Sequence, residues 1–166
     1  MVGRSFATAM LVALFIGCGR LHESTKDVVE TGWIPRAEFE KPALSPFKAR
    51  YDTVALEQDL VGMIRNANVG VNTLVFFGSW CGDSRREVPH FLKIADSCGW
   101  DSSRYHLYGL DRSKKSPDGL TEKYRIEKVP TFIFLKGDDE VGRITEKPAG
   151  TLEADMLAIL ASVKQK

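Results

Sequence analysis

Cysteine is the residue type in this chain best suited to chemistry, and it occurs as Cys18, Cys81 and Cys98. Cys81 lies in the stretch FFGSWCGDSRREVPHF, residues 76–91, where an apolar run typical of a buried strand gives way to a helical pattern. Free backbone N–H groups and the helix dipole stabilise a thiolate at such a helix start. Because the thiolate is the nucleophilic form, the sequence predicts a reactive Cys81. A buried structural thiol is the alternative, which the small and polar residues of the turn disfavour.

The predicted helix after Cys81 carries the other groups that bear on its sulfur. Arg85 and Arg86 would stabilise a thiolate further by leaning toward it, whereas Asp83 would oppose it. Cys98 lies 17 residues after Cys81, at the far end of the helix. The helical rise separates the two Cα atoms by about 24–26 Å, whereas a disulfide needs about 7 Å or less. Cys98 is therefore predicted to be a small buried or half-buried thiol, with pairing to another molecule as the alternative.

The first cysteine follows an apolar N-terminus. Residues 6–16 carry no charge after a short positive start, and eleven helical residues reach only about 16 Å, roughly half of a bilayer core. Residues 1–17 are therefore predicted to be a secretory signal peptide. The run ends Leu-Phe-Ile-Gly before Cys18, which is similar to a bacterial lipobox, whose cysteine receives lipid and becomes the new N-terminus. This resemblance implies an extracytoplasmic, periplasm-facing lipoprotein, in the outer membrane of a Gram-negative cell given Gly19. The alternative is an ordinary signal peptide with a chance cysteine.

Composition and motifs exclude several classes of function. The chain is 43% hydrophobic and 27% charged, as globular proteins are. Its net charge of +1 gives no global case for nucleic-acid binding. His22, His90 and His106 show no ligand spacing with the cysteines, so no metal site is expected. Neither a phosphate-binding glycine loop nor a Ser-His-Asp signature occurs, and we expect no cofactor.

The elements that must position Cys81 follow a tether-like stretch. Residues 18–50 contain three prolines and many charges without a lasting period, which predicts a lipidated N-terminus and a tether. Its apolar residues are expected to pack partly onto the domain surface; they are Trp33, Ile34, Phe39 and Phe47.

A folded domain is expected over residues 51–166. Its first helix would follow a Thr53 cap and turn Leu56, Leu60, Met63 and Ile64 inward. The other predicted elements are strands at 72–77, 105–110, 131–135 and 141–145 and helices at 82–97, 119–124 and after Thr151. This order predicts an α/β domain of three layers.

Several motifs resemble those of the thioredoxin superfamily. Residues 80–82 read Trp-Cys-Gly, Pro89 falls eight residues after the cysteine, and residues 129–131 read Val-Pro-Thr. The WCGDSRREVP stretch also looks like a group of thioredoxin-like lipoproteins of Bacteroidetes. The resemblance implies a thioredoxin-like αβα fold with a central mixed sheet, and a cis-proline edge beside the thiol where an extended peptide can pair. It also implies that the substrates are thiols and disulfides of proteins or small molecules. The implied substrate-binding residues are Trp80, Gly82, Asp83, Val129 and Pro130.

Two departures from the superfamily bear on the mechanism. Ser84 stands where dithiol members have the resolving cysteine, and a hydroxyl cannot accept a disulfide, although it can hydrogen-bond the Cys81 thiolate. Val75 stands where thioredoxin carries a buried aspartate that helps to deprotonate the resolving thiol. Both parts of the resolving step are missing together. We therefore expect a monothiol thiol–disulfide exchange protein in which Cys81 and Ser84 are the catalytic pair and an external thiol resolves the mixed disulfide.

Two other functions remain open at this point. One is a non-catalytic thioredoxin-fold module whose groove around Trp80 and Pro130 holds a peptide or a partner without turnover. The other is a cysteine-based peroxidase, which the absence of the Thr-containing context of such enzymes disfavours. Disulfides persist outside the cytosol, so the predicted export favours the exchange protein.

Overall fold

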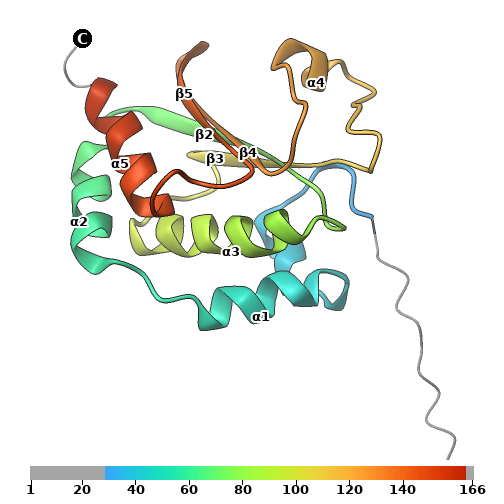
Figure 1. Ribbon diagram of the computed structural model, residues 1–166, viewed down its shortest axis with the longest axis horizontal. Coiled ribbons are helices and arrows are strands. Elements are labelled where there is room, and N and C mark those ends of the chain that lie inside the picture. The colour runs from blue at the N-terminus through green and yellow to red at the C-terminus, as the bar shows by residue number, and fades with distance from the viewer. Residues whose placement is uncertain (1–28, 164–166) are drawn as a thin grey trace, which may run out of the picture.

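The computed structural model describes residues 29–163 of the 166-residue chain. Within them, helices and strands alternate along the chain (Figure 1). The strands are β1 (Gly32–Trp33), β2 (Val71–Phe77), β3 (Tyr105–Gly109), β4 (Thr131–Lys136) and β5 (Asp139–Thr145). The helices are the 3₁₀ helices η1 (Arg36–Glu40) and η2 (Pro42–Leu44), and α1 (Ser45–Thr53), α2 (Gln58–Ala67), α3 (Gly82–Ser97), α4 (Leu120–Lys123) and α5 (Leu152–Val163).

The strands form one mixed sheet in the order β1-β3-β2-β4-β5. Strand β2 runs parallel to β3 and antiparallel to β4, while β1 and β5 pair antiparallel at the two edges. Val75 in the central strand lies opposite Leu107 on one side and Phe132 on the other. Because β2 is covered on both faces, nearly all of its residues are buried, which explains its continuous apolar run. The expected α/β class with a mixed central sheet is confirmed.

The two faces of the sheet are covered unequally. Alternate residues of β2 point to opposite faces, so Val75 and Phe77 join a large apolar cluster with residues of α1, α2, α3 and α5. Leu74 and Phe76 join a smaller cluster with Tyr108 and its neighbours. Figure 1 shows α3 and α1 below the sheet and α4 alone above it. The smaller cluster, on the face with less helix cover, is the one that also packs against Trp80 and Cys81.

Residues 32–50 differ from the expected tether because they are built into the domain. The Phe39 and Phe47 side chains are 3% and 1% exposed, and their ring centroids lie 5.5 and 5.7 Å from that of Phe77. The Ile34 N–H donates to the Leu107 carbonyl at 2.9 Å, which extends the β1 pairing. These elements span two to nine residues, too few for a hydrophobic period to show. Burial of single large side chains, rather than a pattern, holds them.

The first helix of the predicted domain also differs from expectation. Thr53 ends α1, and α2 begins only at Gln58. Its buried residues are Val61, Ile64 and Ala67, whereas Met63 is 55% exposed. The expected helix start at Thr53 lies five residues before the observed one, and Ile64 is the one expected inward residue that is among the buried residues of α2. The other predicted helices and strands agree with the structure within two residues at their ends.

Across residues 29–163, no helix has both the length and the apolar character needed to cross a membrane. The predicted signal peptide of residues 1–17 and the predicted lipidation of Cys18 lie outside the described residues.

Candidate active site at the start of helix α3

Cys81 is the N-cap residue of α3, directly after a tight turn that follows β2. The Cys81 N–H donates to the Gly78 carbonyl at 2.9 Å, and its own carbonyl accepts the Arg85 N–H at 3.0 Å. Its side chain is partly buried and forms no disulfide. The predicted strand-to-helix position of the thiol is confirmed, and its sulfur lies at the end of the helix where N–H groups are unpaired.

A main-chain edge from the β4 side lies beside the sulfur. The Cys81 thiol donates to the Val129 carbonyl at 3.3 Å, and the Val129–Pro130 peptide bond is cis. The Pro130 carbonyl accepts the Glu146 N–H at 2.7 Å, and the Thr131 hydroxyl donates to the Lys128 carbonyl at 2.8 Å. These bonds fix the loop, so Cys81, Val129 and Pro130 are brought together as expected.

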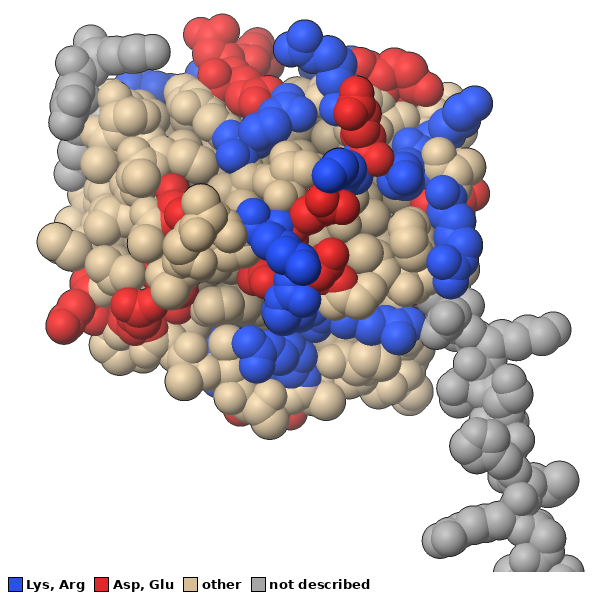
Figure 2. All heavy atoms as spheres, viewed as in Figure 1, with Lys and Arg blue, Asp and Glu red and all other residues tan. Residues whose placement is uncertain are grey.

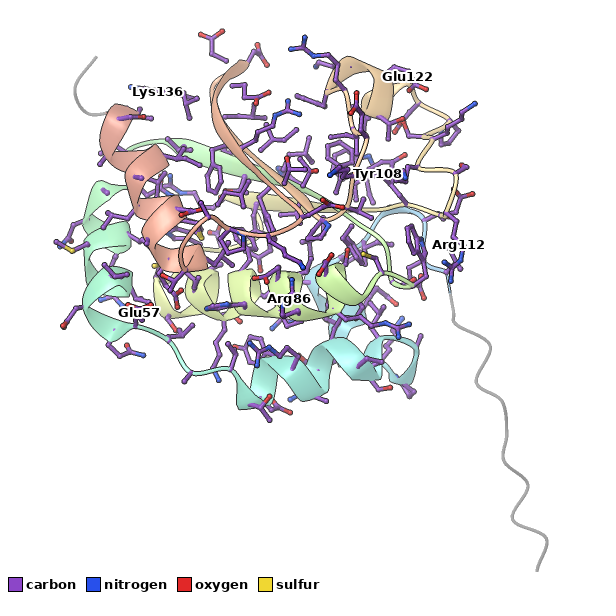
Figure 3. All side chains as sticks on the ribbon, in the orientation of Figure 1. Glu57, Arg86, Tyr108, Arg112, Glu122 and Lys136 are labelled. Atoms are coloured by element: carbon purple, nitrogen blue, oxygen red, sulfur yellow. The ribbon has the colours of Figure 1, made fainter. Side chains whose placement is uncertain are left out.

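Trp80 is held rigidly next to Cys81. Its indole N–H donates to the Leu110 carbonyl, in the loop after β3, at 2.9 Å. A Cβ atom at Gly78 would lie 2.7 Å from the indole, so only glycine lets the ring pack this closely. The Arg112 guanidinium lies over the ring at 4.8 Å from its centroid. Figure 3 shows Arg112 at the end of the molecule where α3 begins.

Ser84 has a different hydrogen bond from the one expected. Its side chain is fully buried, and its hydroxyl accepts the Gly78 N–H at 3.1 Å. Ser84 therefore ties the first turn of α3 to the turn that precedes it, through a bond that the sequence does not predict. Val75 is also fully buried, in the large apolar cluster. Neither position offers a group that can resolve a disulfide.

The charged residues that follow Cys81 pair with one another. Arg86 donates to Asp83 at 2.7 Å and to Glu87 at 2.6 Å, and the hydrogen bond to Glu87 raises the pKa of Arg86. Lys147 approaches Asp83 at 4.0 Å. Arg85 donates from Nε to the Ser79 carbonyl at 2.7 Å. The guanidinium of Arg86 thus pairs with carboxylates of its own helix, and that of Arg85 bonds the main chain of the turn before Cys81.

The two remaining site questions concern Gly82 and Cys98. Gly82 is exposed at the first position of α3, and a Cβ atom there would meet no atom within 4 Å. Cys98 is buried at the far end of α3, where its thiol donates to the Val61 carbonyl at 3.6 Å and burial raises its pKa. The predicted small buried thiol is thus found.

In residues 29–163 no three or more His, Cys, Asp or Glu side chains gather as metal ligands would.

Three residues that shape this site are not predicted by the sequence analysis. Gly78, Leu110 and Arg112 contact Trp80 through the fold, and the last two lie about 30 residues away along the chain. A glycine two residues before a tryptophan is the one local hint that an indole packs back over the turn.

Comparison with known proteins finds similarity to thioredoxins over most of the described chain. A family model described as Thioredoxin matches residues 40–158, which is well over half of the chain. Thioredoxin H9 of Arabidopsis thaliana is 25% identical over 118 residues, which cover 71% of this chain and 75% of that protein. Thioredoxin-2 of Saccharomyces cerevisiae is 32% identical over 80 residues, which cover 48% of this chain and 71% of that protein.

A solved structure of a protein of unknown function from Pseudomonas aeruginosa is similar in fold. It superposes with a TM-score of 0.53 at 17% sequence identity, covering 84% of this chain and 94% of that one. At this identity the similarity concerns the fold alone.

Proposed function

The chain belongs to the thioredoxin family, and we propose that it is a thiol–disulfide exchange protein that works with one nucleophilic cysteine, Cys81. The observation that carries this proposal is the position of the Cys81 sulfur, partly exposed at the start of α3 and 3.3 Å from the Val129 carbonyl. Ser84 and the buried Cys98 leave no second thiol within reach of Cys81 in residues 29–163.

The proposed reaction is a two-step exchange. The Cys81 thiolate attacks one sulfur of a substrate disulfide, the new S–S bond forms, and the old one breaks. The leaving thiolate takes a proton from solvent, and the substrate remains bound as a mixed disulfide. An external thiol, either a second protein or another cysteine of the substrate, then attacks this disulfide and releases Cys81. The cycle itself exchanges disulfides, and net reduction of a substrate consumes the external thiol as reductant.

The residues around Cys81 would position the substrate. An extended peptide would pair with the main-chain edge at Val129 and Pro130, while its flank lies against Trp80. Gly82 leaves open space next to the sulfur, and the partly exposed Asp83 borders it. Ser84 would act by holding the turn before Cys81 in place, since its hydroxyl bonds the Gly78 N–H.

The test compares Cys81→Ser with Cys98→Ser in the full chain. All chains carry Cys18→Ser, so that no thiol lies outside the domain. We expect the parent and Cys98→Ser to form a mixed disulfide with bis(2-hydroxyethyl) disulfide, detected as an added mass on Cys81, and Cys81→Ser to form none. Equal behaviour of all three chains would exclude the proposal. If the wild-type protein shows no disulfide exchange but binds extended peptides, its function is that of a non-catalytic binding module instead.

We also propose that the protein works outside the cytosol on a membrane anchor. The support is the apolar N-terminus and the lipobox-like run before Cys18, together with a redox chemistry that suits compartments where disulfides persist.

A further inference from the structure

Within residues 29–163, the cation over Trp80 has no carboxylate partner. The Arg112 guanidinium lies 4.8 Å from the centroid of the Trp80 ring, and its residue is exposed. No carboxylate in the described part of the chain forms an ion pair with it. Its charge therefore faces solvent beside the residue that precedes Cys81.

Two cations on other segments around Cys81, Arg86 and Lys128, pair with carboxylates. Asp83 pairs with Arg86 at 2.7 Å and lies 4.0 Å from Lys147, and Lys128 pairs with Glu146 at 2.8 Å. Figure 2 shows acidic and basic side chains interspersed in the upper and central parts of the visible face, with large areas that carry neither. Arg112 differs from these two cations because no carboxylate in residues 29–163 pairs with it, and the same holds for Lys114 and Lys115 of its loop.

The position of Arg112 does not follow from a need to hold Trp80. The indole is already fixed by its hydrogen bond to the Leu110 carbonyl and by its packing on Gly78. Arg112 follows Leu110 by two residues in the same loop, so the bond that orients the ring also places the guanidinium over it. The planar guanidinium keeps its N–H donors available at its edge while its face lies on the ring.

We infer that Arg112 determines substrate specificity by favouring disulfides that carry a carboxylate next to the reactive sulfur, such as an acidic residue or a chain terminus. This inference rests on the proposed function of Cys81. A carboxylate in that place is attracted by the guanidinium, whereas a cationic group is repelled.

The experiment measures how fast Cys81 exchanges with three small disulfides of different charge. The full chain carries Cys18→Ser and Cys98→Ala, so that Cys81 is its only thiol. The probes are 3,3′-dithiodipropionate (anionic), bis(2-hydroxyethyl) disulfide (neutral) and cystamine (cationic). Their leaving groups differ, but this difference cancels when the anionic-to-neutral rate ratio of a variant is divided by that of the parent.

The expected result is a change in the rate ratios that follows the charge at residue 112. For charges about 8 Å apart in water, one charge pair corresponds to a factor of about 2 to 3 in rate. Arg112→Gln should therefore lower the anionic-to-neutral ratio about threefold, and Arg112→Glu roughly ninefold, with the cationic-to-neutral ratio rising by similar factors. Arg112→Lys should keep most of the parent ratio, and 0.5 M salt should remove most of each effect.

The matched control is Lys115→Gln, which removes one charge from an exposed residue of the same loop. Its ratios should equal those of the parent. The inference is overturned if Arg112→Gln leaves the ratios at the parent value, or if Lys115→Gln changes them as much.

Failure of the proposed function has a different signature. In that case the parent chain would show no exchange at Cys81 with any of the three disulfides. Alkylation of Cys81 by iodoacetate and by iodoacetamide then reports the preference for an anionic reagent without any disulfide. An iodoacetate-to-iodoacetamide ratio that Arg112→Gln does not lower would exclude a role of Arg112 at the thiol.

Discussion

Ser84 shows how one residue sets the kind of chemistry available at this site. Its hydroxyl accepts the buried Gly78 N–H, so the residue keeps a structural role where a dithiol enzyme has a reactive one. With Val75 buried in apolar surroundings, this position of the central strand offers no carboxylate to take up the proton of a second thiol. The mixed disulfide on Cys81 should therefore persist until a thiol arrives from outside.

Replacing Ser84 with cysteine should supply the missing step. In Ser84→Cys, a thiol three residues after Cys81 lies within the first turn of α3 and can attack the mixed disulfide directly. Release of substrate should then become independent of the external thiol concentration, as measured by quenched non-reducing gels. The control Ser84→Ala should keep the wild-type dependence and lose about 1–3 kcal/mol of unfolding free energy, because the Gly78 N–H loses its acceptor. Continued dependence on external thiol in Ser84→Cys would contradict this reasoning.

Cys98 should react slowly and only at high pH. Burial raises its pKa above the ordinary range, so the reactive thiolate is scarcer in the folded chain than in a free thiol at the same pH. In the folded state, iodoacetamide should label Cys98 at least about tenfold more slowly than it labels the exposed thiol of a short peptide. In urea the two rates should converge. Peptide mapping of the labelled chain from pH 7 to 10 measures both, and rapid labelling of folded Cys98 at pH 7 would refute the prediction.

At the scale of elements, the N-terminal segment η1–α1 behaves as part of the core. Phe39 and Phe47 pack against each other at 5.4 Å and against Phe77 of the central strand. Strand β2 ends with Phe77 and leads directly into the turn that carries Cys81. The aromatic packing on Phe77 therefore helps to hold the turn with Cys81 in position.

Phe47→Ala should accordingly cost about 3–5 kcal/mol of unfolding free energy, as large-to-small changes in cores do. Urea denaturation followed by far-UV circular dichroism measures the loss. Met63→Ala in α2 is the control, because that side chain is 55% exposed and its truncation should change stability by less than about 0.5 kcal/mol. A similar small loss for both variants would show that α1 is only loosely attached.

Strong periodicity explains which elements could be predicted from the sequence. Helix α3 was predicted at its observed bounds, and β2 was recognised from its unbroken apolar run. The segment around Phe47 was not, because α1 and the 3₁₀ helices bury only one residue each and give no period. Within the site, local motifs placed Cys81 and Pro130 correctly, whereas the contact between Arg112 and Trp80 depends on a loop 30 residues away and leaves no local pattern.

At the scale of the whole molecule, we expect anchor and domain to be separable functions. The exchange chemistry depends on Cys81, whereas the proposed attachment depends on Cys18 alone. A lipid on the N-terminal cysteine would hold the chain at a membrane while the folded part remains in water.

Cys18→Ser should therefore move the protein from the membrane fraction to the aqueous fraction of its native cells without changing exchange at Cys81. Detergent phase partition and incorporation of labelled palmitate measure the attachment, and the small-disulfide assay measures exchange. Cys98→Ser serves as control and should stay with the membrane. Palmitate incorporation into Cys18→Ser equal to that of the wild type would contradict the assignment.

One contact near the beginning of the described chain would limit how far the domain reaches from the proposed anchor at Cys18. The Glu30 N–H donates to the Ser79 hydroxyl at 3.2 Å, and the Glu30 carbonyl lies so close to Gly109 that no Cβ would fit there. The N-terminal part of the chain thus contacts the active-site turn at Ser79, two residues before Cys81. Only twelve residue steps separate Glu30 from Cys18. Fully extended, these steps reach about 40 Å, against more than about 100 Å for the 33 residues of the expected tether. With a lipid on Cys18, Cys81 would react only with proteins that lie close to the same membrane surface. Which substrates it meets would then depend on which proteins are present at that surface.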